Sequence, residues 1–154
     1  MKDTKNKSKH LIIGIGNSAR ADDALGWAFV SHVSQIMGDV FDYELRYQLQ
    51  VEDSELICNY ESILFVDATK EPLQDGFEMK RCEIAEHYYF SSHAQNPETV
   101  VYLASTLYDA NPEAFVLAIS GEEWDLKEAM SEAAQNNLRA AIDHFVSNAW
   151  KQVT

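Results

Sequence analysis

Three short runs of consecutive apolar residues constrain the fold of this chain more than any other feature of its sequence. A continuous apolar run of this length is typical of a strand that is buried on both faces, as strands of parallel sheets are. Each run is followed by glycine or by a polar residue, where we expect the chain to leave the sheet. The runs span residues 11–15, 63–66 and 115–119.

Segments with helical periodicity lie between and after these runs. A helix is expected from about Asp23, because apolar residues then recur every three or four positions. Asn96 and Pro97 suit the start of another helix, and a last helix is expected from about Leu126 to Trp150. The remaining elements are shorter or more polar: a helix at 52–60, an alternating strand at 41–50 and a weak edge strand at 77–85.

This alternation of strands and helices predicts an α/β fold. We expect three layers, with a twisted, mostly parallel sheet of about five strands and helices on both faces. In such sheets ligands bind beyond the carboxyl ends of the strands, where the strand order changes direction. The loops at 16–23, 67–76 and 120–125 are therefore expected to surround any site.

Composition narrows the class of protein and its partners. With 154 residues and 46% hydrophobic residues, the chain is expected to form a single domain over 11–154, after a disordered tail at 1–10. The formal net charge of −13 disfavours nucleic acids and anionic membranes as partners and favours a basic one. Cys58 and Cys82 form no paired-cysteine motif, and no leader or membrane-spanning segment is evident, so we expect a cytoplasmic protein.

Three side chains from separate loops at the same edge of the sheet form a candidate metal site. Asp23 follows the first apolar strand, Asp67 ends the second, and His93 precedes the helix that starts at Pro97. Two carboxylates and one imidazole suit zinc, manganese, iron or nickel better than magnesium or calcium, which prefer oxygen ligands. The spacing alone does not establish this site, because a helix cap at Asp23, a turn residue at Asp67 and a surface histidine would show the same spacing.

A dinucleotide site is disfavoured by charge. Residues 14–19 fit the glycine-rich fingerprint, but four further residues separate it from the expected helix. Asp22 and Asp23 would then lie where the phosphates must bind. Arg20 is available either to bind a substrate carboxylate or to pair with Asp22.

Taken together, several motifs of the chain resemble those of the hydrogenase maturation proteases, the endopeptidases that trim the large subunit of nickel–iron hydrogenases. The resemblance covers about residues 11–145. It rests on five motifs in the family's order: Gly14-Ile15-Gly16-Asn17 with Arg20 to Gly26; Gln48-Leu49 with Glu52; Asp67-Ala68 after an apolar strand; Ser92-His93 with Pro97 and Leu103-Ala104; and the strand 115–119 with Gly121 and Ser131.

The resemblance implies a specific reaction. Asp23, Asp67 and His93 match the family's metal-contacting residues, with Asp23 and Asp67 as the catalytic carboxylates. No permanently bound metal is expected; the enzyme would recognise nickel in the precursor of the hydrogenase large subunit and then remove a C-terminal peptide. Two ways of activating the water remain open. The metal could act as a Lewis acid, or a carboxylate could act as general base while nickel only anchors the substrate.

Two alternatives remain open at this point. One is a metal-dependent hydrolase on the same fold with its own metal and a different peptide or amide substrate. The other is a non-catalytic metal- or nucleotide-binding module. The chain also departs from many relatives in having Ala21 and Ala24 where they carry glycine, which alters the loop only if those positions need a positive φ.

Overall fold

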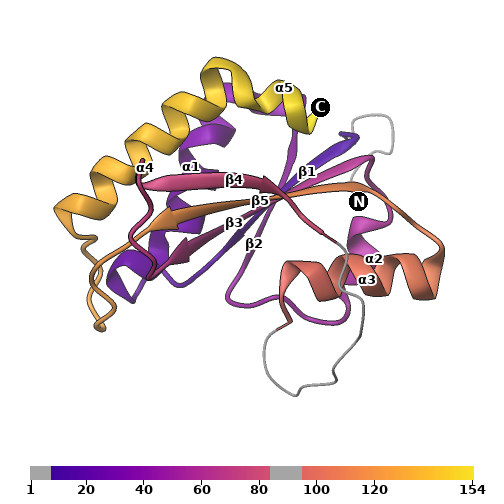
Figure 1. Ribbon diagram of the computed structural model, residues 1–154, viewed down its shortest axis with the longest axis horizontal. Helices are drawn as coiled ribbons and strands as arrows, with labels where there is room; N and C mark the ends of the chain where they lie inside the picture. The colour runs from indigo at the N-terminus through magenta and orange to yellow at the C-terminus, as the bar shows by residue number, and fades with distance from the viewer. Residues whose placement is uncertain (1–7, 84–94) are drawn as a thin grey trace.

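A computed structural model of the chain describes residues 8–83 and 95–154. Its centre is one five-stranded sheet with the strand order β2-β1-β3-β5-β4 (Figure 1). All neighbouring strands are parallel except β4 and β5, which are antiparallel, and this confirms the expected mostly parallel sheet. The strands are β1 (His10–Ile15), β2 (Asp42–Arg46), β3 (Ser62–Thr69), β4 (Phe77–Arg81) and β5 (Glu113–Ser120).

Helices cover both faces of this sheet, as the three-layer prediction requires (Figure 1). One face packs against α1 (Leu25–Met37), α4 (Glu132–His144) and α5 (Trp150–Val153), with a π-helical turn at Phe145–Ala149 between the last two. The other face packs against α2 (Asp53–Ile57) and α3 (Pro97–Tyr108). Two short 3-10 turns, Ala21–Ala24 and Gly38–Val40, flank α1.

Each central strand contributes to both hydrophobic cores, which explains its continuous apolar sequence. In β1, Ile12 packs on the α1 and α4 side, whereas Leu11 and Ile13 pack on the α2 and α3 side. All three side chains are fully buried. A strand with helices on both faces has no wet side and therefore shows no polar alternation.

The last helix begins later than the sequence suggests. Residues 121–131 form an irregular loop, and α4 starts only at Glu132, where the Ser131 side chain accepts a hydrogen bond of 3.1 Å from the Ala134 amide. This N-cap fixes the start of the helix. The loop that precedes it lies at the carboxyl end of β5, beside the site described below.

The alternating strand is shorter than its pattern predicts. β2 ends at Arg46, whose guanidinium is paired with Asp53 at 3.1 Å, and Leu49 forms only an isolated bridge with Gln95. The backbone carbonyl of Arg46 also accepts hydrogen bonds from the Gly16 amide and the Trp27 indole, at 2.9 and 3.0 Å. After Arg46, these contacts of its side chain and carbonyl group take the place of further pairing between β2 and β1.

Two glycines let α1 lie directly on the sheet. A Cβ at Gly26 would overlap the carbonyl oxygens of Ile15 and Val66, and one at Gly14 would lie 2.6 Å from the Gly26 carbonyl oxygen. Glycine is required where a helix backbone approaches a strand this closely. Within the described residues, no helix is long and apolar enough to cross a lipid bilayer.

Candidate active site

Strand order reverses between β1 and β3, and a pocket lies at their carboxyl ends. β1 leads to β2 on one side, while β3 neighbours β5 on the other, so the two loops that follow β1 and β3 diverge around a crevice. The pocket in this crevice has a volume of about 320 Å³. Its lining residues are Arg20, Asp23, Asp67, Ala68, Lys70 and Trp124. The structure thus brings Asp23 and Asp67 into one pocket, although 44 residues separate them in the chain.

Asp67 enters this pocket from the sheet itself. It lies near the end of β3, opposite Ala118 of β5, and its Oδ1 atom accepts a hydrogen bond of 2.8 Å from the Ala68 amide. The pKa of Asp67 is raised to about 7, mainly by burial. The hydrogen bond from the Ala68 amide lowers this pKa, and the negative charge of Asp23 raises it further. Near neutral pH this carboxyl group can therefore both accept and release a proton.

Asp23 reaches the same pocket from the 3-10 turn after β1. Burial raises its pKa above the ordinary value, and the positive charge of Arg20 opposes that rise. The charge of Arg20 therefore acts on Asp23, whereas the hydrogen bonds to the Asp22 carboxylate come from the loop after β5. Neither aspartate is a helix cap, because no side chain caps the 3-10 turn or α1.

Asp22 has a different role, which sequence reasoning missed. Its carboxylate is fully buried and accepts four hydrogen bonds, from the amides of Glu122, Glu123 and Ser131 and from the Ser131 hydroxyl, all between 2.7 and 2.8 Å. Burial alone raises the pKa of Asp22, but these donors together lower it below the ordinary value. The ionised side chain therefore fastens the loop 121–131 to the turn that carries Asp23.

Trp124 belongs to that fastened loop and covers one side of the pocket. The Lys70 ammonium lies 5.6 Å from the centre of the Trp124 ring, a cation–π distance. A Cβ at Gly121 would lie 2.7 Å from the Asp22 Cβ and 3.1 Å from the Trp124 ring, so this close packing requires glycine. The acidic run Glu122-Glu123 is thus held by its backbone at the pocket rim.

His93, the third member of the predicted trio, lies outside the described residues. The chain is described again from Gln95, whose amide donates a hydrogen bond of 3.0 Å to the Leu49 carbonyl oxygen. Among the described residues, no group of three histidine, cysteine, aspartate or glutamate side chains is arranged to hold a metal ion. Asp23 and Asp67 place two carboxylates in one pocket, and the nitrogen donor of the predicted set would have to come from His93.

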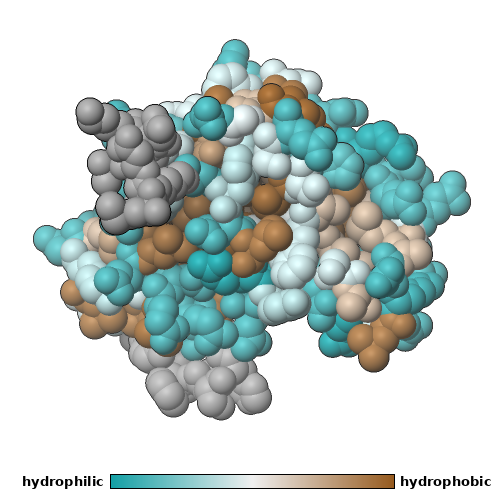
Figure 2. All heavy atoms as spheres, turned by 180° about the vertical axis from the view of Figure 1, so that it is seen from behind, coloured by the Kyte–Doolittle hydropathy of each residue, from teal (hydrophilic) through white to brown (hydrophobic). Residues whose placement is uncertain are grey.

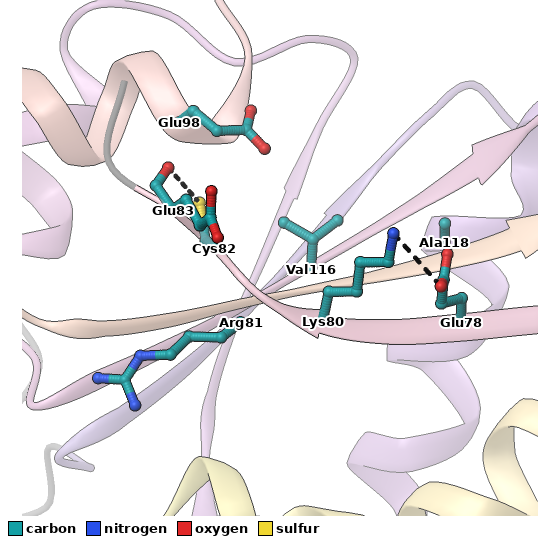
Figure 3. Close-up of a pocket in the computed structure, with 8 residues that line it drawn as sticks. All are labelled: Glu78, Lys80, Arg81, Cys82, Glu83, Glu98, Val116 and Ala118. Atoms are coloured by element: carbon teal, nitrogen blue, oxygen red, sulfur yellow. Dashed lines mark hydrogen bonds and ion pairs between the residues drawn. The ribbon is translucent and has the colours of Figure 1, made fainter. Parts of the chain in front are cut away.

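Another hollow, beside β4, is less suited to catalysis (Figure 3). Lys80 lies on its wall, paired with Glu78 at 3.3 Å, whereas Arg81 points to the opposite side of the sheet. Burial raises the pKa of Cys82 to about 12, and the charges of Glu98 and Glu83 contribute. Because the thiolate is the nucleophilic form, this cysteine is poorly placed to attack a substrate.

Comparison with known proteins identifies the fold. The HycI nickel–iron hydrogenase maturation protease of Thermococcus kodakarensis superposes with a TM-score of 0.70 at 18% identity, over 92% of each chain. The HybD hydrogenase maturating endopeptidase of E. coli superposes with a TM-score of 0.68 at 15% identity, over 94% of this chain and 93% of that one. This chain has the hydrogenase maturation protease fold. A hydrogenase 2 maturation peptidase from a Thaumarchaeota archaeon superposes with a TM-score of 0.67 at 17% identity, over 93% of this chain and 99% of that one.

Comparison by sequence does not extend this similarity. No protein-family model matches the chain, and no curated protein matches it by sequence. The similarity that the comparisons show therefore lies in the arrangement of the elements. One motif departure now has a structural meaning: Ala21 has a φ of 48°, in the left-handed region, whereas Ala24 has a φ of −78°. A glycine is conformationally favoured only at the first of these positions.

Proposed function

We propose that this chain is an endopeptidase that removes a C-terminal peptide from the nickel-loaded precursor of a nickel–iron hydrogenase large subunit. One observation carries the proposal: Asp23 and Asp67 meet in a single pocket at the point where strand order reverses, on the fold of the maturation proteases. The nickel belongs to the substrate. Asp23, Asp67 and His93 are the proposed groups that contact it.

The proposed reaction is hydrolysis of one peptide bond. A water oxygen attacks the carbonyl carbon, the bond from carbon to nitrogen breaks, and the water's proton passes to the departing amine. We assign the transfer of that proton to Asp67, because it lies on β3 in the lining of the pocket and the hydrogen bond from the Ala68 amide orients its carboxyl group. Asp23, on the adjacent turn, then serves as the anchor for the substrate's nickel.

Dependence on nickel would make the enzyme a checkpoint. If the metal of the precursor completes the geometry around the scissile bond, a precursor without metal is positioned poorly and is cleaved slowly. The gain comes from orienting water, carboxylate and carbonyl group in one arrangement. The negative charge of this protein, −13 overall, also favours a basic partner surface around the cleavage site.

The proposal is tested by measuring the intact mass of a nickel-loaded precursor after incubation with the protein. Wild-type protein should release one defined C-terminal peptide, and the Asp67→Asn and His93→Ala variants should cleave at least about 100-fold more slowly. Asp39→Asn is the matched control, because Asp39 is an exposed aspartate in the turn at Gly38–Val40. Cleavage by Asp67→Asn at the wild-type rate would contradict the assignment of the base.

A further inference from the structure

A larger hollow adjoins the pocket that contains Asp23 and Asp67. Its volume is about 610 Å³, and it lies between the loop after β3, the end of β5 and α4. Lys70 and Trp124 line both spaces, so the stacked pair forms the boundary between them. In Figure 2 the molecule is seen from behind, where its surface is largely hydrophilic with scattered hydrophobic residues.

Hydrogen bonds fix the walls of this hollow. The Ser120 hydroxyl donates to the Glu71 carbonyl oxygen at 2.7 Å and accepts from the Leu73 amide at 2.9 Å, which ties the loop after β3 to β5. The Asn137 side-chain amide donates to the Ser120 carbonyl oxygen at 2.9 Å and so ties α4 to the same point. A cavity with walls held in this way is formed before a ligand arrives.

The groups that line the hollow suit a short peptide. Gln74 brings a side-chain amide, which matches the donors and acceptors of a peptide backbone, and Trp124 presents an aromatic ring for an apolar or cationic side chain. Asp75 and Glu122 add negative charge at the wall. The volume lies within the range of pockets that enclose small ligands, so a folded domain does not fit.

We propose that this hollow is the subsite for the C-terminal peptide that the reaction releases; this inference rests on the proposed function. In the proposed complex, the part of the precursor that is retained presents its nickel at the pocket that contains Asp23 and Asp67. The chain beyond the scissile bond is a short free end, and the adjacent space past Lys70 and Trp124 is large enough to receive it. Binding of this segment holds the scissile bond in the first pocket.

The test fills the hollow from α4 without touching either carboxylate. Ala133 lines the hollow, whereas Ala140 is exposed on the same helix and does not line it. We expect Ala133→Trp to lower kcat/KM for the nickel-loaded precursor at least about tenfold, mainly through KM, and Ala140→Trp to leave it unchanged. A synthetic peptide with the sequence of the released segment should inhibit wild-type protein and Ala140→Trp, but not Ala133→Trp.

The outcomes separate the subsite from the reaction. Should Ala133→Trp fail to fold, as judged by its thermal unfolding, Gln74→Trp on the exposed loop replaces it with the same expectation. Wild-type kinetics and unchanged peptide inhibition in the folded blocking variant would overturn the subsite while leaving the proposed function in place. Absence of cleavage by wild-type protein would overturn the proposed function, and the subsite with it.

Discussion

Asp22 and Ser131 are joined by two hydrogen bonds of 2.7 Å each, although 109 residues separate them in the chain. One runs from the Ser131 amide to Asp22 Oδ1, and the other from the Ser131 hydroxyl to Asp22 Oδ2. The same serine caps α4. This pair therefore connects the turn after β1 with the loop after β5, and these two segments supply Asp23 and Trp124 to the pocket.

Asp22→Asn should destabilise the protein strongly. The substitution places an amide group against donors that now face a carboxylate, and buried hydrogen bonds to a charged group contribute about 1.5–3 kcal/mol each. We expect a loss of about 3 kcal/mol in the free energy of unfolding, measured by urea denaturation, with Asp39→Asn close to wild type. A loss below about 0.5 kcal/mol would show that the carboxylate does not hold the two loops together.

Asp67 should reduce stability at neutral and alkaline pH. Its folded pKa of about 7 lies above the ordinary value of 3.8, so the folded state binds more protons than the unfolded state between these values. The free energy of unfolding should therefore fall as the pH rises from about 4 to about 7 and should fall no further, from this group, at higher pH.

Asp67→Asn should remove this penalty, because the asparagine cannot ionise and its oxygen can still accept the Ala68 amide hydrogen bond. At about pH 8 we expect the variant to be more stable than wild type by about 2 kcal/mol, and at about pH 4 the two should be nearly equal. Thermal unfolding of metal-free protein at both pH values measures the difference. A variant less stable than wild type at the higher pH would contradict the assigned cause.

The two alanines of the loop should respond differently to glycine. Both are buried, but only Ala21 has a positive φ. Ala24→Gly removes a buried methyl group and increases the conformational entropy of the unfolded chain. Together these effects should lower the free energy of unfolding by about 1–2 kcal/mol. Ala21→Gly meets the same losses but relieves a left-handed conformation worth about 1 kcal/mol, so it should be nearly neutral. Urea denaturation of the pair checks this, and equal losses would contradict it.

Loss of the Cys82 thiol should leave cleavage intact. Burial and two glutamates raise the pKa of this thiol to about 12, so it stays protonated and unreactive at neutral pH. We expect Cys82→Ser to cleave the precursor at a rate within about twofold of wild type, and iodoacetamide to inactivate neither protein. Inactivation of wild type but not of the serine variant would indicate that the thiol takes part.

The sequence predicts the strands and the meeting of Asp23 with Asp67 because both follow from local patterns and one topological rule. Apolar runs identify β1, β3 and β5, and their parallel arrangement places the two aspartates at one edge. The predicted start of α4 is too early, because residues 126–131 are compatible with a helix locally, whereas distant contacts with the Ala21 amide and the Asp22 carboxylate hold them in a loop. A buried carboxylate with partners about a hundred residues away leaves no local pattern.

The most direct test of the central claim is to compare nickel-loaded with nickel-free precursor in the presence of wild-type protein, by intact mass over time. The account predicts that the loaded precursor loses one C-terminal peptide and that the nickel-free precursor is cleaved at least about tenfold more slowly. Equal cleavage of both forms would contradict recognition of the substrate's nickel. No cleavage of a correctly loaded precursor would contradict the endopeptidase assignment itself.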